Sequence, residues 1–319
     1  NGDPTLSNRF YNEPTDIFNS WAEELKKLGI NKINGNIIGD DNSFEDNHLG
    51  YGWSFNGLQA WYSAEFGPLQ LNENVIDIRI FPPTTADELI EIKPNLPSKY
   101  FTIINEIEVV ESGTSNISYE RKFGENIIRL SGRVAIGSSS IEVSPSITNP
   151  TLFYVTVLKE VLEANGIEVA GNAVDCDDIS GYQTNMDETV ILVTHKSPAL
   201  KEILKGLMKR SQNNYAETMV RLLGWHKTGY GTFREGRKVV DEVLQSMGIE
   251  TGTYAFMDGS GLTRYNYISP EQIIKILIAM KDTPYRETWV DIQPVAGVDG
   301  TLRNRMKGTA AEGNAKAKT

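Results

Sequence analysis

Residues 209–217 read Lys209-Arg210-Ser211-Gln212-Asn213-Asn214-Tyr215-Ala216-Glu217. Apolar residues recur at helical spacing before this stretch, from Leu200 to Leu207, behind the helix-start signal Ser197-Pro198. A second helical run is expected from Asn214 to Leu223, ending at Gly224. Ser211-Gln212-Asn213 therefore lies at a break between two helices, where polar side chains can face a cleft. Ser-x-Asn alone is a weak signal, because short patterns arise often by chance.

A second pattern closes the sequence, which ends Ala315-Lys316-Ala317-Lys318-Thr319. These residues read as a strand entering Lys-Thr-Gly without its glycine. They follow Ser211 by more than a hundred positions, so the fold has room to bring two separate elements together. Another copy, Lys227-Thr228-Gly229, comes directly after the expected helix end at Gly224, and we interpret it as a loop outside the catalytic machinery.

Both patterns, in these surroundings, resemble the class C low-molecular-mass penicillin-binding proteins, which are serine D-alanyl-D-alanine carboxypeptidases/endopeptidases. Further segments match that family in order and spacing: Gly2-Asp3-Pro4-Thr5-Leu6, Gly39-Asp40-Asp41-Asn42-Ser43-Phe44, Leu71-Asn72-Glu73-Asn74, Asp258-Gly259-Ser260-Gly261-Leu262-Thr263-Arg264 and Pro294-Val295-Ala296-Gly297-Val298-Asp299-Gly300-Thr301-Leu302. The resemblance thus spans nearly the whole chain. Enzymes with this chemistry carry Ser-x-x-Lys, Ser-Asp-Asn and Lys-Thr-Gly, so Gln212 departs from the middle motif.

The resemblance implies roles for five residues. Ser211 would shuttle a proton beside the nucleophile, and the Asn213 amide would bind the substrate's peptide carbonyl. Lys318 would hold local positive charge, and Thr319 would offer its hydroxyl to the terminal carboxylate. Asp41 would face the free end of the substrate's stem peptide. No metal or organic cofactor is implied.

The nucleophile's own motif is missing, since none of the serines is followed three residues later by lysine. In the family that motif precedes the segment that begins here, so we expect a truncated, inactive piece of a longer enzyme. That enzyme would cleave peptidoglycan stem peptides ending in D-Ala-D-Ala, bind β-lactam antibiotics, and work in the periplasm or elsewhere outside the cytoplasm. The alternatives are a non-catalytic peptidoglycan-binding protein and a β-lactamase.

The resemblance also implies an α+β fold, an antiparallel sheet covered by helices as in β-lactamases and transpeptidases, truncated at both ends. Alternating β-branched segments from about 74 to 143 predict a strand-rich module, and Asn149-Pro150 predicts a return to helix. We therefore expect three domains: a mixed first part of an insertion (1–75), a β-rich inserted module (76–148) and the transpeptidase-like core (149–319). An unpaired sheet edge would leave this chain marginally stable or poorly soluble.

Composition excludes several other functions. The net charge of −11 disfavours nucleic acid as a partner, and neither a membrane span nor an export signal is expected. Cys176, the single cysteine, lies among aspartates and is interpreted as a structural thiol. The three histidines lack any known metal-binding or serine-triad context.

Overall fold

The computed structural model describes residues 2–184 and 186–319, which form two compact units. The first unit holds residues 3–41 and 55–196, and the second holds 42–54 and 197–319. The chain therefore enters the second unit briefly before it returns to complete the first. Among the described residues, no helix is both long and apolar enough to cross a bilayer.

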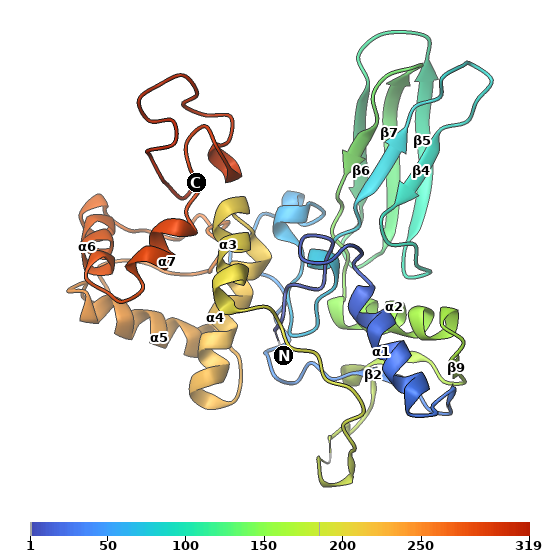
Figure 1. Ribbon diagram of the computed structural model, residues 1–319, viewed down its shortest axis with the longest axis horizontal. Coiled ribbons are helices and arrows are strands. Elements are labelled where there is room, and N and C mark those ends of the chain that lie inside the picture. Colours follow the sequence, from blue (N-terminus) through green and yellow to red (C-terminus); the bar gives the residue numbers. More distant parts are fainter. Residues whose placement is uncertain (1, 185) are drawn as a thin grey trace. The chain divides into compact units, whose positions relative to one another are not determined.

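The described part of the first unit contains two α-helices and the paired strands, many of which are labelled in Figure 1. They are α1 (Asp16–Lys27), β1 (Lys32–Ile33), β2 (Ile37–Gly39), β3 (Ile78–Phe81), β4 (Glu91–Pro94), β5 (Thr102–Val110), β6 (Asn116–Arg121), β7 (Ile127–Ala135), β8 (Ile141–Val143), α2 (Pro150–Ala164), β9 (Glu168–Val169) and β10 (Ala173–Asp175). The second unit is mainly helical. Its helices are α3 (Leu200–Arg210), α4 (Asn213–Thr228), α5 (Phe233–Ser246), α6 (Pro270–Lys281) and α7 (Arg286–Asp291).

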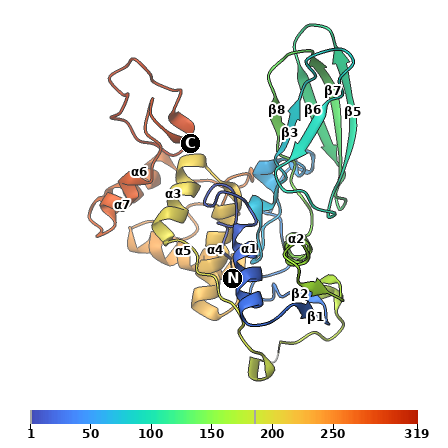
Figure 2. The same ribbon diagram turned by 45° about the vertical axis from the view of Figure 1, so that its right-hand side comes forward.

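The strand-rich segment forms two three-stranded sheets, ordered β4-β3-β8 and β5-β7-β6 (Figure 2). All their pairings are antiparallel except that of β5 with β7. Alternate residues of β3 and β7 point into a shared core, where Ile78, Ile80, Ile128 and Leu130 are fully buried. This alternation is the period-two pattern that the sequence shows.

Two segments of the first unit repeat one design, a helix followed by two short strands. Helices α1 and α2 both end at a glycine with positive φ, Gly29 and Gly166, and the next isoleucine N–H bonds back to the helix. The strands that follow pair in parallel, β1 with β9 and β2 with β10, at a constant offset of 136 residues. The third helix–Gly–Ile junction, at Gly248, closes α5 in the same way but leads into no named strand.

Helix α2 lies near the predicted boundary between the inserted module and the core. Asn149 caps α2 as predicted, accepting a hydrogen bond from the Leu152 N–H. Helix α2, however, packs within the first unit, against α1 and the buried β-rich core. Its apolar residues form part of that buried core. The longer segment of the second unit begins at Ser197, and the three-domain division stays a prediction.

Helix α4 continues past its predicted end. It runs to Thr228 and closes at Gly229, whose φ is +81°, whereas Gly224 lies inside the helix. Gly224 instead allows close packing against α5. A Cβ at this position would lie 2.9 Å from the Gly236 nitrogen and 2.9 Å from the carbonyl oxygen of Thr232, the N-cap of α5. In α5, a Cβ on Gly236 would overlap the Val220 carbonyl. The two glycines let α4 and α5 cross closely.

The chain combines helices with several small separate sheets, in which parallel and antiparallel pairings both occur, so the fold class is α+β, as predicted. In the described part of the second unit, strand pairing is confined to isolated bridges, Phe44–Gly231, Ala255–Tyr267 and Val295–Lys316. The last of these bridges belongs to the end of the chain that carries the second motif.

Candidate functional site

Ser211 lies at the predicted break between helices. It caps the C-terminus of α3 with left-handed backbone angles (φ 58°, ψ 50°), and the Gln212 N–H donates to the Leu207 carbonyl at 3.0 Å. Asn213 then starts α4. The left-handed turn is uncommon for a non-glycine residue, and such turns cluster at functional sites.

Lys318 reaches this turn from the other end of the second unit. Its Nζ donates to Ser211 Oγ at 2.5 Å, although the two residues are 107 positions apart. Ser211 Oγ donates in turn to the Thr319 carbonyl at 3.1 Å. The fold therefore brings together the hydroxyl of the first motif and the amine of the second. Burial lowers the pKa of Lys318, so a larger fraction of its amine is neutral and able to accept a proton than in a solvated lysine.

Backbone pairing positions the segment that carries Lys318. Lys316 bridges Val295 in antiparallel fashion, the Ala296 N–H donates to the Ala315 carbonyl (2.9 Å), and the Ala317 N–H donates to Pro294 (3.1 Å). The end of the chain is thus extended, as the sequence predicted. Thr319 Oγ1 lies 2.7 Å from Thr301 Oγ1, so Thr301 joins the site.

Lys209 ties the two parts of the site together. Its Nζ donates to Asp299 Oδ2 (2.7 Å) and to the Gln293 carbonyl (2.6 Å). The end of α3 is thereby fixed to the segment that pairs with residues 315–317. Lys209 and Thr301 were not predicted as site residues, although both lie in stretches that carry the family resemblance; their roles depend on contacts that spacing does not reveal.

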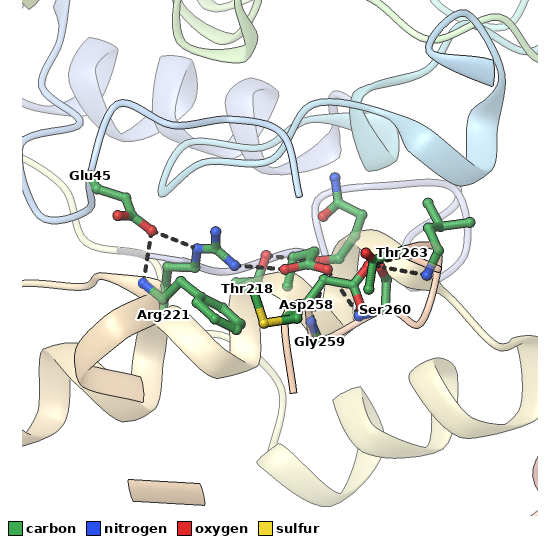
Figure 3. A network of polar contacts seen from close by, with 12 residues as sticks. Glu45, Thr218, Arg221, Asp258, Gly259, Ser260 and Thr263 are labelled. Atoms are coloured by element: carbon green, nitrogen blue, oxygen red, sulfur yellow. Dashed lines mark hydrogen bonds and ion pairs between the residues drawn. The ribbon is translucent and has the colours of Figure 1, made fainter. Parts of the chain in front are cut away.

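A buried polar network supports α4 just beyond Asn213 (Figure 3). Glu217 is fully buried and pairs with Arg221 at 2.6 Å, and Arg221 also reaches Glu45 at 3.3 Å. The other Glu217 oxygen accepts the N–H groups of Gly259 and Ser260 at 3.0 and 2.9 Å. Burial raises the pKa of Glu217. Because Glu217 already accepts these two N–H groups, this glycine-containing turn cannot use them to bind a phosphate.

Asp258 organises that turn. Its carboxylate accepts hydrogen bonds from the Gly261 N–H (2.9 Å), the Thr263 N–H (2.8 Å) and Trp53 Nε1 (2.9 Å). These bonds close residues 258–261 into a tight turn. One of these donors, Trp53, lies in the segment 42–54, so this hydrogen bond helps to hold that segment in the second unit.

Asp41 lies in the first unit, apart from the other four predicted residues. It is 2% exposed, and its two oxygens accept from Thr151 Oγ1 (2.5 Å) and Cys176 Sγ (3.3 Å). Asp175 and Asp177 complete a compact acidic group. Burial, followed by the neighbouring aspartates, raises the pKa of Cys176 to about 12, as a structural thiol requires.

The second Lys-Thr-Gly copy, Lys227-Thr228-Gly229, was predicted to be a loop but is helical, because α4 continues past Gly224. Lys227 and Thr228 form the last turn of α4, Gly229 is its C-cap, and Lys227 pairs with Glu242 on α5. Among the histidines, His195 lies 3.2 Å from Asp3 and 3.5 Å from the Tyr11 hydroxyl, within the first unit.

Comparisons with known proteins agree on one relationship. The sequence profile of the D-Ala-D-Ala carboxypeptidase 3 (S13) family matches residues 1–319. The chain is 29% identical to the D-alanyl-D-alanine carboxypeptidase of Actinomadura sp. (strain R39), over 100% of this chain and 59% of the relative. It is 25% identical to the D-alanyl-D-alanine carboxypeptidase DacB of Haemophilus influenzae, over 90% of this chain and 59% of the relative.

Solved structures give the same result. The crystal structure of penicillin binding protein 4 (dacB) from Haemophilus influenzae matches with a TM-score of 0.78 and 25% identity, over 100% of this chain and 68% of that chain. A second structure of that protein, complexed with a β-lactam, matches with a TM-score of 0.70 and 24% identity. The chain spans about three fifths of the length of the curated relatives it matches.

Proposed function

Because the chain belongs to the D-Ala-D-Ala carboxypeptidase 3 (S13) family, we propose that it forms part of a serine-type D-alanyl-D-alanine carboxypeptidase/endopeptidase. The substrates would be peptidoglycan stem peptides ending in D-Ala-D-Ala, outside the cytoplasm, and β-lactam antibiotics would react at the same site. The observation that carries this proposal is the contact between Lys318 Nζ and Ser211 Oγ.

That contact suits proton transfer during acylation. A lysine whose pKa is lowered by burial can share a proton with Ser211, which can pass it between the attacking serine and the leaving amine. The attacking serine would come from a Ser-x-x-Lys motif in the longer protein. The 319-residue chain by itself would then form no acyl-enzyme.

The remaining residues would bind the substrate. Asn213, at the start of α4, would donate its amide N–H to the peptide carbonyl, and the Thr319 hydroxyl would bind the terminal carboxylate. The extended segment 315–317 would pair with the substrate backbone as an added strand. For Asp41 we keep the role at the free end of the stem peptide, although its burial means that it would act there only through a rearrangement of its bonds to Thr151 and Cys176.

Labelling with a fluorescent penicillin tests the proposal. The full-length protein should acquire a covalent adduct, detected by intact mass, whereas the 319-residue chain should not. In the full-length protein, Ser211→Ala and Lys318→Ala should each slow acylation by about 100-fold or more, as expected for loss of acid–base catalysis.

Lys227→Ala is the matched control, because it removes the same side chain from the decoy Lys-Thr-Gly and should leave labelling unchanged. An adduct followed by slow release, together with cleavage of a D-Ala-D-Ala peptide, would support the peptidase; fast release would indicate a β-lactamase. Failure of the full-length protein to label would favour the non-catalytic peptidoglycan-binding alternative.

A further inference from the structure

Two exposed aromatic rings face a groove on the first unit. Phe55 and Phe123 are 70% and 56% exposed, their centroids lie 6.0 Å apart, and their planes are inclined by 50°. Phe55 belongs to a short 3-10 helix (Phe55–Gly57), and Phe123 lies in the turn after β6. The groove that they border has a volume of about 510 Å³. Large aromatic side chains kept in solvent side by side often mark a binding surface.

A buried arginine holds the two ring-bearing segments together. Arg121 is 5% exposed, and its guanidinium donates to the Leu58 carbonyl (3.2 Å) next to the first ring and to the Glu125 carbonyl (3.0 Å) next to the second. Its backbone N–H also donates to Gln59 Oε1 at 2.9 Å. Burying a guanidinium is unfavourable, so its Nη donors hold these carbonyls and fix the groove's walls before any ligand arrives, although its Nε has no hydrogen-bond partner among the described residues.

The rim of the groove is polar and open. Asn56, Gln59 and Glu120 line it together with Lys122. Among residues 2–184 and 186–319, the side chains of Asn56 and Glu120 have no hydrogen-bond or ion-pair partner, and Gln59 uses only its Oε1. The groove therefore offers apolar ring faces on its walls, and amide donors and a carboxylate acceptor at its edge.

We propose that this groove binds a sugar unit of an N-acetylated glycan, which stacks against Phe55 and Phe123. A pyranose has apolar C–H faces and a polar edge of hydroxyls, which matches rings flanked by hydrogen-bonding groups. An acetamido group would suit the amides of Asn56 and Gln59. Glu120 and the net charge of −11 disfavour a polyanion. The choice of an N-acetylhexosamine rests on the proposed function, because peptidoglycan stem peptides hang from such glycans.

Calorimetric titration of the 319-residue chain with chitotetraose tests this site. We expect saturable binding that Phe55→Ala and Phe123→Ala each weaken by about 2- to 10-fold, the range for one aromatic contact. Both side chains are exposed, so their removal should leave the fold intact. Tyr285→Ala, also at a 70% exposed aromatic but in the second unit, is the matched control and should bind as the unaltered chain does.

Maltotetraose, which lacks acetamido groups, should bind more weakly than chitotetraose. Absence of saturable binding, or equal binding by the F55A/F123A double variant, would overturn the proposal. The titration does not depend on acylation. Chitotetraose binding by this chain, with no penicillin labelling of the full-length protein, would therefore reject the peptidase and keep the glycan site. Labelling of the full-length protein, with no chitotetraose binding, would reject the glycan site and keep the peptidase.

Discussion

The two units of this chain are stabilised differently. In the first unit, apolar side chains from strands and helices gather into two clusters of buried residues, and no such cluster is found in the described part of the second unit. Although the first unit also buries charged side chains, polar groups such as Glu217, Arg221 and Asp258 make up a larger share of the buried residues in the second unit. Its helix α6 leaves four aliphatic side chains at least 45% exposed: Ile273, Ile274, Leu277 and Ile278.

This difference matters because the two kinds of interior respond differently to substitution. An apolar core loses free energy roughly in proportion to the volume removed. A buried ion pair contributes little net stability, but loss of one partner leaves an uncompensated charge. The unit that carries Ser211 and Lys318 therefore depends on directional contacts, which also fix side-chain positions near a reactive site.

The largest effect should come from the apolar core of the first unit. Phe153 is fully buried and packs against Tyr100 with ring centroids 5.3 Å apart. Phe153→Ala should lower the free energy of unfolding of this unit by about 3–5 kcal/mol. Hydrogen exchange read peptide by peptide should show faster exchange in the first unit only. Leu89→Ala, at a 91% exposed position, is the control. Equal acceleration in both units would show that they unfold together.

A somewhat smaller effect is expected from the polar interior of the second unit. Arg221→Ala leaves Glu217 buried without its ion-pair partner and should destabilise the second unit by about 3 kcal/mol. Hydrogen exchange should accelerate in α4 and in the turn at residues 258–261. Arg234→Ala removes an 84% exposed arginine and should change stability by less than about 1 kcal/mol. Little effect of Arg221→Ala would contradict the assigned role of the network.

The acidic group of the first unit should add a modest dependence on pH. Burial, together with Asp41 and Asp178, raises the pKa of Asp175 despite its bonds from Asn149 and the Asp177 N–H. The folded state then holds the proton of Asp175 more tightly than the unfolded state does. The stabilisation that protonated Asp175 gives the folded state is therefore present below the ordinary pKa of aspartate and is lost as pH rises through the raised pKa. Asp175→Asn should flatten this decline in chemical-denaturation curves. An unchanged pH profile would contradict it.

The sequence predicted local features best. The strand-rich segment follows from period-two alternation, as predicted, and the helix ends at Gly29, Gly166 and Gly248 use the residue type that most readily adopts positive φ. Gly224 misled the prediction because its role is close contact with α5, which no single segment reveals. Ser197-Pro198 also gave a start that was too early, since α3 begins at Leu200 after Ala199 and has no side-chain cap.

The candidate site was predictable only in part. The motifs indicated Ser211 and Lys318, and the structure brings them into contact. Long-range partners such as Lys209 with Asp299, or Trp53 with Asp258, depend on the folded path of the chain. Neither pair has a spacing that periodicity or a short motif could detect. The same is true of Phe55 and Phe123, which become neighbours only when β6 is in place.

The smallest effect is expected on the exposed face of α6. Ile274 is 55% exposed, so Ile274→Ser should change the melting temperature very little, corresponding to less than about 0.5 kcal/mol. Ile203→Ser, on α3 at a 5% exposed position, is the matched contrast and should destabilise strongly. A large loss for Ile274→Ser would mean that this face is covered in solution. If that loss shrinks as the protein is diluted, the cover is a second copy of the chain, because dilution removes an intermolecular contact from the unaltered chain as well.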